Sequence, residues 1–240
     1  MNYYESLREG ISSKDLTVAV IGMGYVGVPL LTCFASKGFT VLGVDVDDTK
    51  IEALSNSISP FSHIPSGSLK DVKNNTTFTV NYAIVDTADV IVICVPTPVD
   101  KRKKPDLTSV KSVIERLLSL SLRGKLIILE STTYPGCTRE QLVCPFELMD
   151  MTVGTDVFVG YSPEREDPGN ESYSTKQIPK VVSGYTSKCR ELCSKLYSEI
   201  IEHTVEAPSL EVAEASKLLE NTQRAVNIAL VNEFKLVRTA

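Results

Sequence analysis

One stretch near the N-terminus, residues 18–45, restricts the possible folds more than any other part of the chain. Four apolar residues, Val18 to Ile21, lead directly into the turn Gly22-Met23-Gly24-Tyr25-Val26-Gly27. A helical pattern follows, and then a second apolar run, Val41 to Val44, which ends at Asp45. This order predicts a buried strand, a tight glycine turn, a helix, a second strand and an acidic residue at its end.

Each glycine of this turn has its own physical role. Gly22 lets the chain turn sharply out of the strand, Gly24 lets a pyrophosphate approach the backbone, and Gly27 permits close helix-on-strand packing. The N–H groups at the start of the helix face the phosphates, where the helix dipole favours negative charge. Glycine turns also occur without a ligand. Here a strand precedes the turn, a helix follows it and an acidic residue lies at the expected spacing, and this combination favours a dinucleotide site.

Asp45 identifies the dinucleotide. It lies 23 positions after Gly22, close to the spacing of a carboxylate that accepts hydrogen bonds from the adenosine ribose. Because a carboxylate there repels a 2′-phosphate, the expected cofactor is NAD rather than NADP.

Composition limits the other classes of function. The net charge of −5 gives no electrostatic footprint for nucleic acid. The one basic cluster, residues 101–104, is short enough to be a solvated loop, and the alternative is a rim that attracts an anionic substrate. No segment reaches the roughly 18 apolar residues needed to cross a bilayer, so no membrane partner is expected.

The cysteines and histidines indicate neither a disulfide framework nor a metal site. The six cysteines form no CxxC pair, which favours a reduced, cytoplasmic protein with free thiols. With only two histidines, His63 and His203, a histidine-rich metal centre is not expected.

Strand and helix patterns alternate along the rest of the chain. Expected strands cover residues 77–80, 90–95, 126–129, 157–161 and 204–206, with a shorter segment from 181. Expected helices cover residues 3–10, 49–55, 106–122, 138–149 and 187–201, with a helical turn at 82–86 and a loop at 56–69. Because parallel strands need crossovers, this order predicts an α/β fold with a doubly wound, mostly parallel, Rossmann-type sheet.

Ligands in such sheets bind beyond the carboxyl ends of the strands. The segments that follow the expected strands are Gly22–Gly27, Asp45, Val95–Pro98, Glu130–Thr133 and Ser162–Pro168. They are rich in polar residues, glycine and proline, and we expect them to form the active face.

A long connecting α-helix is expected at the end of the chain, because Leu210 to Ala240 contains neither proline nor glycine. A polar stripe at helical spacing comprises Glu214, Lys217, Asn221 and Arg224. An apolar stripe comprises Val212, Leu219, Val226, Leu230, Phe234 and Val237. A solvated amphipathic helix is one interpretation, but an asparagine in mid-helix usually has a partner.

Five motifs together resemble the nucleotide-sugar dehydrogenases, the family of UDP-glucose and GDP-mannose dehydrogenases. They are the glycine turn at 22–27, Val95-Pro96-Thr97-Pro98, Glu130-Ser131-Thr132-Thr133-Tyr134-Pro135-Gly136, the run 161–170 and Lys217-Leu218-Leu219-Glu220-Asn221. Within that family, residues 164–170 and 224–228 are similar, almost residue for residue, to the UDP-N-acetylglucosamine 6-dehydrogenase branch.

The resemblance implies an NAD-dependent oxidation of the C6 alcohol of a UDP-sugar to the uronic acid. Two hydrides pass to two NAD+ through a cysteine-bound thioester, and the product serves surface polysaccharide synthesis. Thr132 would position water, Glu164 would be the acid/base, and Lys217 and Asn221 would stabilise oxyanions. The implied cofactor residues are Gly22, Gly24, Tyr25, Val26, Gly27, Asp45, Lys50, Val95, Pro96, Thr97 and Thr132. The implied substrate residues are Glu164, Arg165, Glu166, Lys217, Asn221 and Arg224.

The resemblance also implies a domain plan. Residues 1–207 would form the NAD-binding domain and residues 208–240 the start of a central dimerisation region that makes a homodimer. The C-terminal sugar-nucleotide domain, with the nucleophilic cysteine, would be absent. Cys137 follows Gly136 near the active face and could substitute for that nucleophile, but we interpret it as a residue at the start of a helix. The 240 residues alone are therefore expected not to catalyse the reaction. The alternative is a non-catalytic dinucleotide-binding and dimerisation module.

Overall fold

The fold is built on one eight-stranded sheet. The computed structural model describes residues 2–62, 64–99, 104–164 and 179–238. The strands are β1 (Thr17–Ile21), β2 (Thr40–Val44), β3 (Thr76–Thr79), β4 (Val90–Ile93), β5 (Leu126–Leu129), β6 (Phe158–Tyr161), β7 (Lys180–Gly184) and β8 (Thr204–Glu206). Their order across the sheet is β3-β2-β1-β4-β5-β6-β7-β8.

Neighbouring strands are parallel except at one position, where β7 runs antiparallel to β6. The chain starts in the middle of the sheet at β1, winds outward to β3, and returns to continue from β4 on the other side. The expected doubly wound, mostly parallel sheet is therefore confirmed.

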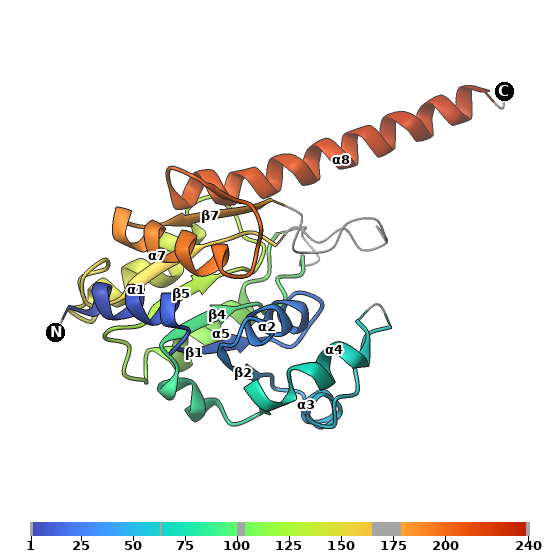
Figure 1. Ribbon diagram of the computed structural model, residues 1–240. Helices are drawn as coiled ribbons and strands as arrows, with labels where there is room; N and C mark the ends of the chain where they lie inside the picture. The colour runs from blue at the N-terminus through green and yellow to red at the C-terminus, as the bar shows by residue number, and fades with distance from the viewer. Residues whose placement is uncertain (1, 63, 100–103, 165–178, 239–240) are drawn as a thin grey trace.

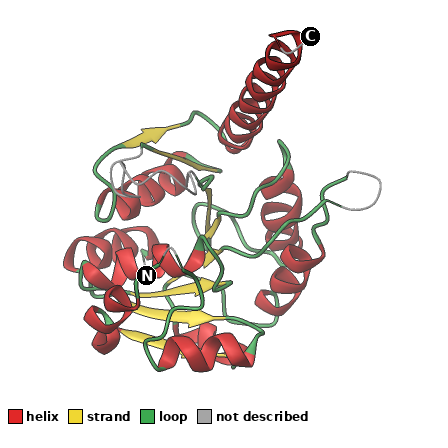
Figure 2. Cartoon of the chain, turned by 90° about the vertical axis from the view of Figure 1, so that its right-hand side faces the viewer, coloured by secondary structure: helices red, strands yellow, loops and turns green. Residues whose placement is uncertain are grey.

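Helices and helical turns connect the strands and cover both faces of the sheet (Figure 2). They are α1 (Tyr3–Ser13), α2 (Gly27–Ser36), α3 (Asp48–Ser55), α4 (Ser66–Asp71), η1 (Lys73–Asn75), η2 (Tyr82–Thr87), α5 (Thr108–Leu117), η3 (Arg139–Val143), α6 (Cys144–Leu148), α7 (Ser187–Ser198) and α8 (Leu210–Arg238). With both faces covered, every residue of β4, β5 and β6 is buried, as expected of parallel strands made of continuous apolar residues.

The helix expected at 3–10 continues to Ser13, and the helix expected at 106–122 covers only Thr108–Leu117. The structure corrects three further elements. The prediction of a loop over 56–69 is wrong for its last residues, because α4 begins at Ser66 and places Leu69 in the core. The helix expected at 138–149 is a π-helical turn, η3, followed by α6. Pro145 lies at the start of α6, and its missing N–H removes a regular helical hydrogen bond at this junction. The strand expected at 90–95 ends at Ile93.

The long helix α8 is confirmed through Arg238, and Figure 1 shows it extending well beyond the body of the molecule. Its first turns pack on the body, where Leu210 and Ala213 are fully buried. Beyond Lys217, the large apolar side chains as far as Phe234 are exposed, Leu219 and Phe234 to 70% and 67%. Among the described residues, no helix is long and apolar enough to span a membrane.

Candidate active site at the carboxyl edge of the sheet

The glycine turn between β1 and α2 has the backbone geometry expected of a dinucleotide loop. Gly22 has a φ of +99°, and an added Cβ would lie 2.6 Å from the carbonyl oxygen of Cys94. A Cβ on Gly27 would overlap the carbonyl oxygen of Gly22, so these two glycines are required by packing. Gly24 is different, because nothing lies within 4 Å of the Cβ position there. The turn is therefore open at Gly24, where a pyrophosphate needs to approach the backbone.

The start of α2 is also open to an anion. No side chain caps this helix end, and no acidic residue lies in its first turn. The positive end of the helix dipole therefore meets no capping side chain and no acid in the first turn, although the Val28 N–H donates to the Gly24 carbonyl oxygen and Pro29 has no N–H. The residues of this loop fit a diphosphate.

Asp45 lies at the end of β2, beside the glycine turn. One carboxylate oxygen accepts hydrogen bonds from the Met23 N–H at 2.7 Å and from Lys50 Nζ at 2.9 Å. The other accepts from the Asp47 N–H at 3.0 Å. The structure thus brings together Asp45 and Lys50, two of the expected cofactor residues, and holds the carboxylate in one orientation.

The loops after β4 and β5 are joined by two hydrogen bonds. Thr97 Oγ1 donates to the carbonyl oxygen of Thr132 at 2.7 Å. Ser131 Oγ donates to the carbonyl oxygen of Val95 at 2.7 Å. Segments 95–97 and 131–132, far apart in sequence, therefore form one surface, on which the Thr132 side chain is exposed.

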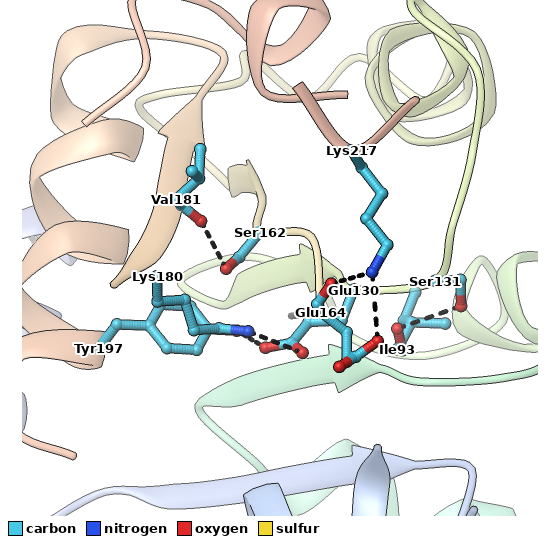
Figure 3. A network of polar contacts seen from close by, with 9 residues as sticks. All are labelled: Ile93, Glu130, Ser131, Ser162, Glu164, Lys180, Val181, Tyr197 and Lys217. Atoms are coloured by element: carbon cyan, nitrogen blue, oxygen red, sulfur yellow. Dashed lines mark hydrogen bonds and ion pairs between the residues drawn. The ribbon is translucent and has the colours of Figure 1, made fainter. Parts of the chain in front are cut away.

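Lys217 and Glu164 form an ion pair at this edge (Figure 3). Lys217 Nζ, from α8, donates to the backbone carbonyl oxygen of Glu164 and lies 3.4 Å from its Oε2. The other carboxylate oxygen, Oε1, is buried and has no hydrogen-bond partner among the described residues. An unpaired buried carboxylate oxygen is costly, and a catalytic role or a bound water or ion is among the explanations for such a group.

The environment of Glu164 favours its protonated form. Burial raises the pKa of the Glu164 carboxyl, while the Lys217 ammonium and its hydrogen bond oppose that rise. The carboxyl therefore holds its proton to a higher pH than an exposed glutamic acid, which suits a group that exchanges protons.

A second charged cluster lies next to this pair and was not predicted from the sequence. Lys180 Nζ lies 3.1 Å from Glu130 Oε2, and the Tyr197 hydroxyl donates to Glu130 Oε1. Figure 3 shows Lys180 and Tyr197 reaching Glu130 from the side opposite Lys217. Because β7 is antiparallel to β6, its first residue, Lys180, lies at the carboxyl edge of the parallel strands. The only hint in the sequence was Glu130, an acid directly after a buried strand.

Not all of the expected site residues come together. Asn221 and Arg224 lie on the exposed part of α8 beyond Lys217. Arg165, Glu166 and the 167–170 part of their motif fall outside the described residues. Glu214, which shares a stripe with Lys217, is fully buried rather than directed at a ligand.

The environment of the cysteine near this edge, Cys137, disfavours a nucleophilic role. Cys137 is fully buried, and burial raises the pKa of its thiol to about 12. Only a thiolate attacks, so this thiol is inert at neutral pH. In the described part of the chain, no group of three or more His, Cys, Asp or Glu side chains could hold a metal ion.

Residues 16–201 match the profile of the UDP-glucose/GDP-mannose dehydrogenase family, NAD binding domain. The chain belongs to this family. Its cofactor is therefore NAD, in agreement with the glycine turn and Asp45.

The proteins that the chain resembles are named for several different sugar nucleotides. The chain is 41% identical over 226 residues to a UDP-N-acetyl-D-glucosamine 6-dehydrogenase of Pseudomonas aeruginosa, covering 93% of this chain and 53% of the relative. It is 32% identical to a UDP-D-ManNAc dehydrogenase structure from Pyrococcus horikoshii, with a TM-score of 0.85 over 92% of this chain and 54% of that one. A GDP-mannose dehydrogenase structure from Pseudomonas aeruginosa gives 26% identity and a TM-score of 0.81, with 90% and 51% covered. The chain thus spans about half the length of the relatives it matches.

Proposed function

We propose that these residues form the oxidant-binding half of an NAD-dependent nucleotide-sugar 6-dehydrogenase. The reaction would take the C6 alcohol of a UDP-sugar to the uronic acid with two NAD+, for surface polysaccharide precursors. UDP-N-acetylglucosamine is the favoured sugar nucleotide, because identity to a relative named for it is 41%, against 32% or 33% for the relatives named for UDP-N-acetyl-D-mannosamine.

The observation that carries this proposal is the Lys217–Glu164 pair, with its unpartnered carboxylate oxygen, within electrostatic reach of Glu130, which begins the loop that carries Thr132. NAD, when bound at this edge, supplies the hydride acceptor. Glu164, with its raised pKa, would act as the acid/base: it would take the proton from the reacting hydroxyl, pass it to solvent, and later take a proton from the water that attacks the thioester. The Lys217 ammonium would stabilise the negative charge that develops on the same oxygen.

The remaining residues of the edge have supporting roles in the proposal. Thr132, exposed at the surface and held through its carbonyl by Thr97, would position water. The residues that would hold NAD are Gly22, Gly24, Tyr25, Val26, Gly27, Asp45, Lys50, Val95, Pro96, Thr97 and Thr132. Asn221, Arg224, Arg165 and Glu166 remain proposed sugar-side residues.

The dimer and the location of the reaction belong to the same proposal. The exposed apolar side chains of α8 support its use as a homodimer contact in a central region that starts at residue 208. All six cysteines are free thiols, which supports a reducing, cytoplasmic setting.

We also propose that the 240 residues bind NAD without turnover. The cysteine chemistry of the reaction needs an accessible thiolate at the carboxyl edge. Cys94, Cys137 and Cys193 are buried with raised thiol pKa values. The exposed Cys144 begins α6, and the partly exposed Cys33 lies within α2, so neither follows a strand at that edge. When the chain is mixed with NAD+ and UDP-N-acetylglucosamine, we expect no formation of NADH. In a separate equilibrium titration, we expect the same chain to bind NADH.

The deciding experiment uses the product of the full reading frame that contains these residues. NADH formation is measured with UDP-N-acetylglucosamine, UDP-N-acetylmannosamine and UDP-glucose. Two NADH per UDP-N-acetylglucosamine supports the proposal, and no NADH from any UDP-sugar refutes it. If the reading frame ends at Ala240 and the product only binds NADH, the non-catalytic module is the correct interpretation.

A further inference from the structure

A buried carboxylate from α8 holds the loop that carries Thr132. Glu214 Oε2 accepts a hydrogen bond from the Gly136 N–H at 2.6 Å. Its Oε1 accepts from the Thr138 N–H at 2.8 Å and from Thr138 Oγ1 at 2.6 Å, and Thr133 Oγ1 lies at 3.5 Å. The Glu214 side chain has no exposed surface. A charged group is buried this completely only where its partners are specific.

These donors belong to the start of a helical segment. The first N–H groups of a helix have no partner within it, and η3 begins just after Thr138 with no side-chain cap of its own. Glu214 therefore supplies the cap from 76 residues away in sequence. The negative charge also lies at the positive end of the helix dipole.

Glu214 lies three residues, about one helical turn, before Lys217 on α8. The two side chains reach two different loops: Glu214 holds the loop after β5, and Lys217 contacts Glu164 in the loop after β6. The Glu214 hydrogen bonds therefore fix the rotation of α8 about its axis together with the buried Leu210 and Ala213, and the position of Lys217 Nζ depends on this rotation.

We propose that Glu214 is a positioning residue for the oxidation, an inference that rests on the proposed function. Glu214 would fix α8 so that Lys217 contacts Glu164 near the loop that carries Thr132. Glu214 itself contacts neither substrate nor cofactor. Its effect passes through the loop 133–138 and through Lys217.

The test is a double-mutant cycle that combines Glu214→Gln with Lys217→Met in the 240-residue chain. The measured quantity is the pKa of Glu164, followed in carbon-13 NMR spectra. Glu214→Gln keeps the shape of the side chain, but its amide NH2 would face the N–H of Gly136 or Thr138. We expect Lys217→Met to raise the Glu164 pKa in the wild-type background and to lose most of that effect in the Glu214→Gln background. The milder Thr138→Val, which removes only the hydroxyl donor, should give an intermediate loss even if Glu214→Gln folds poorly.

The chain offers a matched control in Glu211, three residues earlier on α8. Glu211 pairs with Arg139 of the same helical segment at 2.7 Å, but its side chain is 32% exposed. In the Glu211→Gln background the Lys217→Met effect should be unchanged. If Glu214→Gln lowers only the melting temperature and leaves the Lys217→Met effect intact, Glu214 is a structural cap and the inference is wrong.

Kinetics separate this inference from the proposed function. In the full reading-frame product, Glu214→Gln should lower kcat by on the order of tenfold to a hundredfold, as expected for a small displacement of a reacting group. The KM for NAD should stay the same. No turnover in the wild type would refute the proposed function, while the NMR cycle would still decide the role of Glu214.

Discussion

The Lys217–Glu164 pair allows a quantitative prediction for Lys217→Met. The two charges are 3.4 Å apart, and their side chains are 12% and 19% exposed. Coulomb's law at that separation gives about 5 kcal/mol at an effective dielectric constant of about 20 and about 1.2 kcal/mol in water. Removing the ammonium should therefore raise the Glu164 pKa, by a free-energy difference on the order of 1 to 5 kcal/mol between these two limits.

The sign of this change follows from the charges. Lys217 stabilises the ionised carboxylate, so its loss favours the protonated form and adds to the rise that burial already causes in the pKa of Glu164. Lys180 and Glu130 also act on the pKa of Glu164, in opposite directions. They remain in place in the variant.

The assay is carbon-13 NMR of protein labelled at the glutamate carboxyl carbon, with the Glu164 signal assigned by its loss in Glu164→Gln. Lys14→Met is the control, because it removes a lysine paired with Glu199 at 3.8 Å, before the first strand. The control should leave the Glu164 titration unchanged. A Glu164 pKa that stays the same or falls in Lys217→Met would refute the pairing.

Three further predictions concern the proposed cofactor and substrate residues. Asp45→Ala should lower the preference for NADH over NADPH in equilibrium titrations, because the carboxylate that repels a 2′-phosphate is gone; an unchanged ratio would contradict the ribose assignment. Gly27→Ala should strongly destabilise the chain in thermal melts, since its Cβ would overlap the Gly22 carbonyl, whereas Gly67→Ala, with nothing within 4 Å, should be tolerated. Equal melting temperatures for the two would disprove the packing argument. In the full reading-frame product, Lys217→Ala should cost on the order of a hundredfold in kcat, and a change confined to KM would mean ground-state binding only.

Features that depend on local sequence could be predicted well. The strand, glycine turn, helix and acid of residues 18–45 are specified by residues close together in the chain, and the structure confirms their arrangement. The alternation of strands and helices was sufficient to predict a mostly parallel sheet, because few topologies are compatible with a repeated strand–helix order.

Contacts between distant segments could not be predicted in the same way. The Glu130–Lys180 pair depends on the one antiparallel strand, β7, whose direction no local pattern revealed. Helical spacing placed Glu214 in a stripe with Lys217, but spacing does not show that one carboxylate is buried against a helix start while its neighbour faces the site. The helix expected at 138–149 did not include the π-helical turn that precedes Pro145.

One measurement tests most directly whether NAD and Glu164 share the carboxyl edge. NADH is titrated into the carbon-13-labelled 240-residue chain while the Glu164 carboxyl signal is followed, in parallel with NADH fluorescence. We predict a saturable shift of the Glu164 signal with the same midpoint as the fluorescence change. A larger side chain at Gly24, as in Gly24→Val, should abolish both changes, and Gly24→Ala should leave the fold intact, because nothing in the protein lies within 4 Å of the position of its Cβ. NADH binding that leaves the Glu164 signal unmoved, or that is as tight in Gly24→Val, would contradict this arrangement.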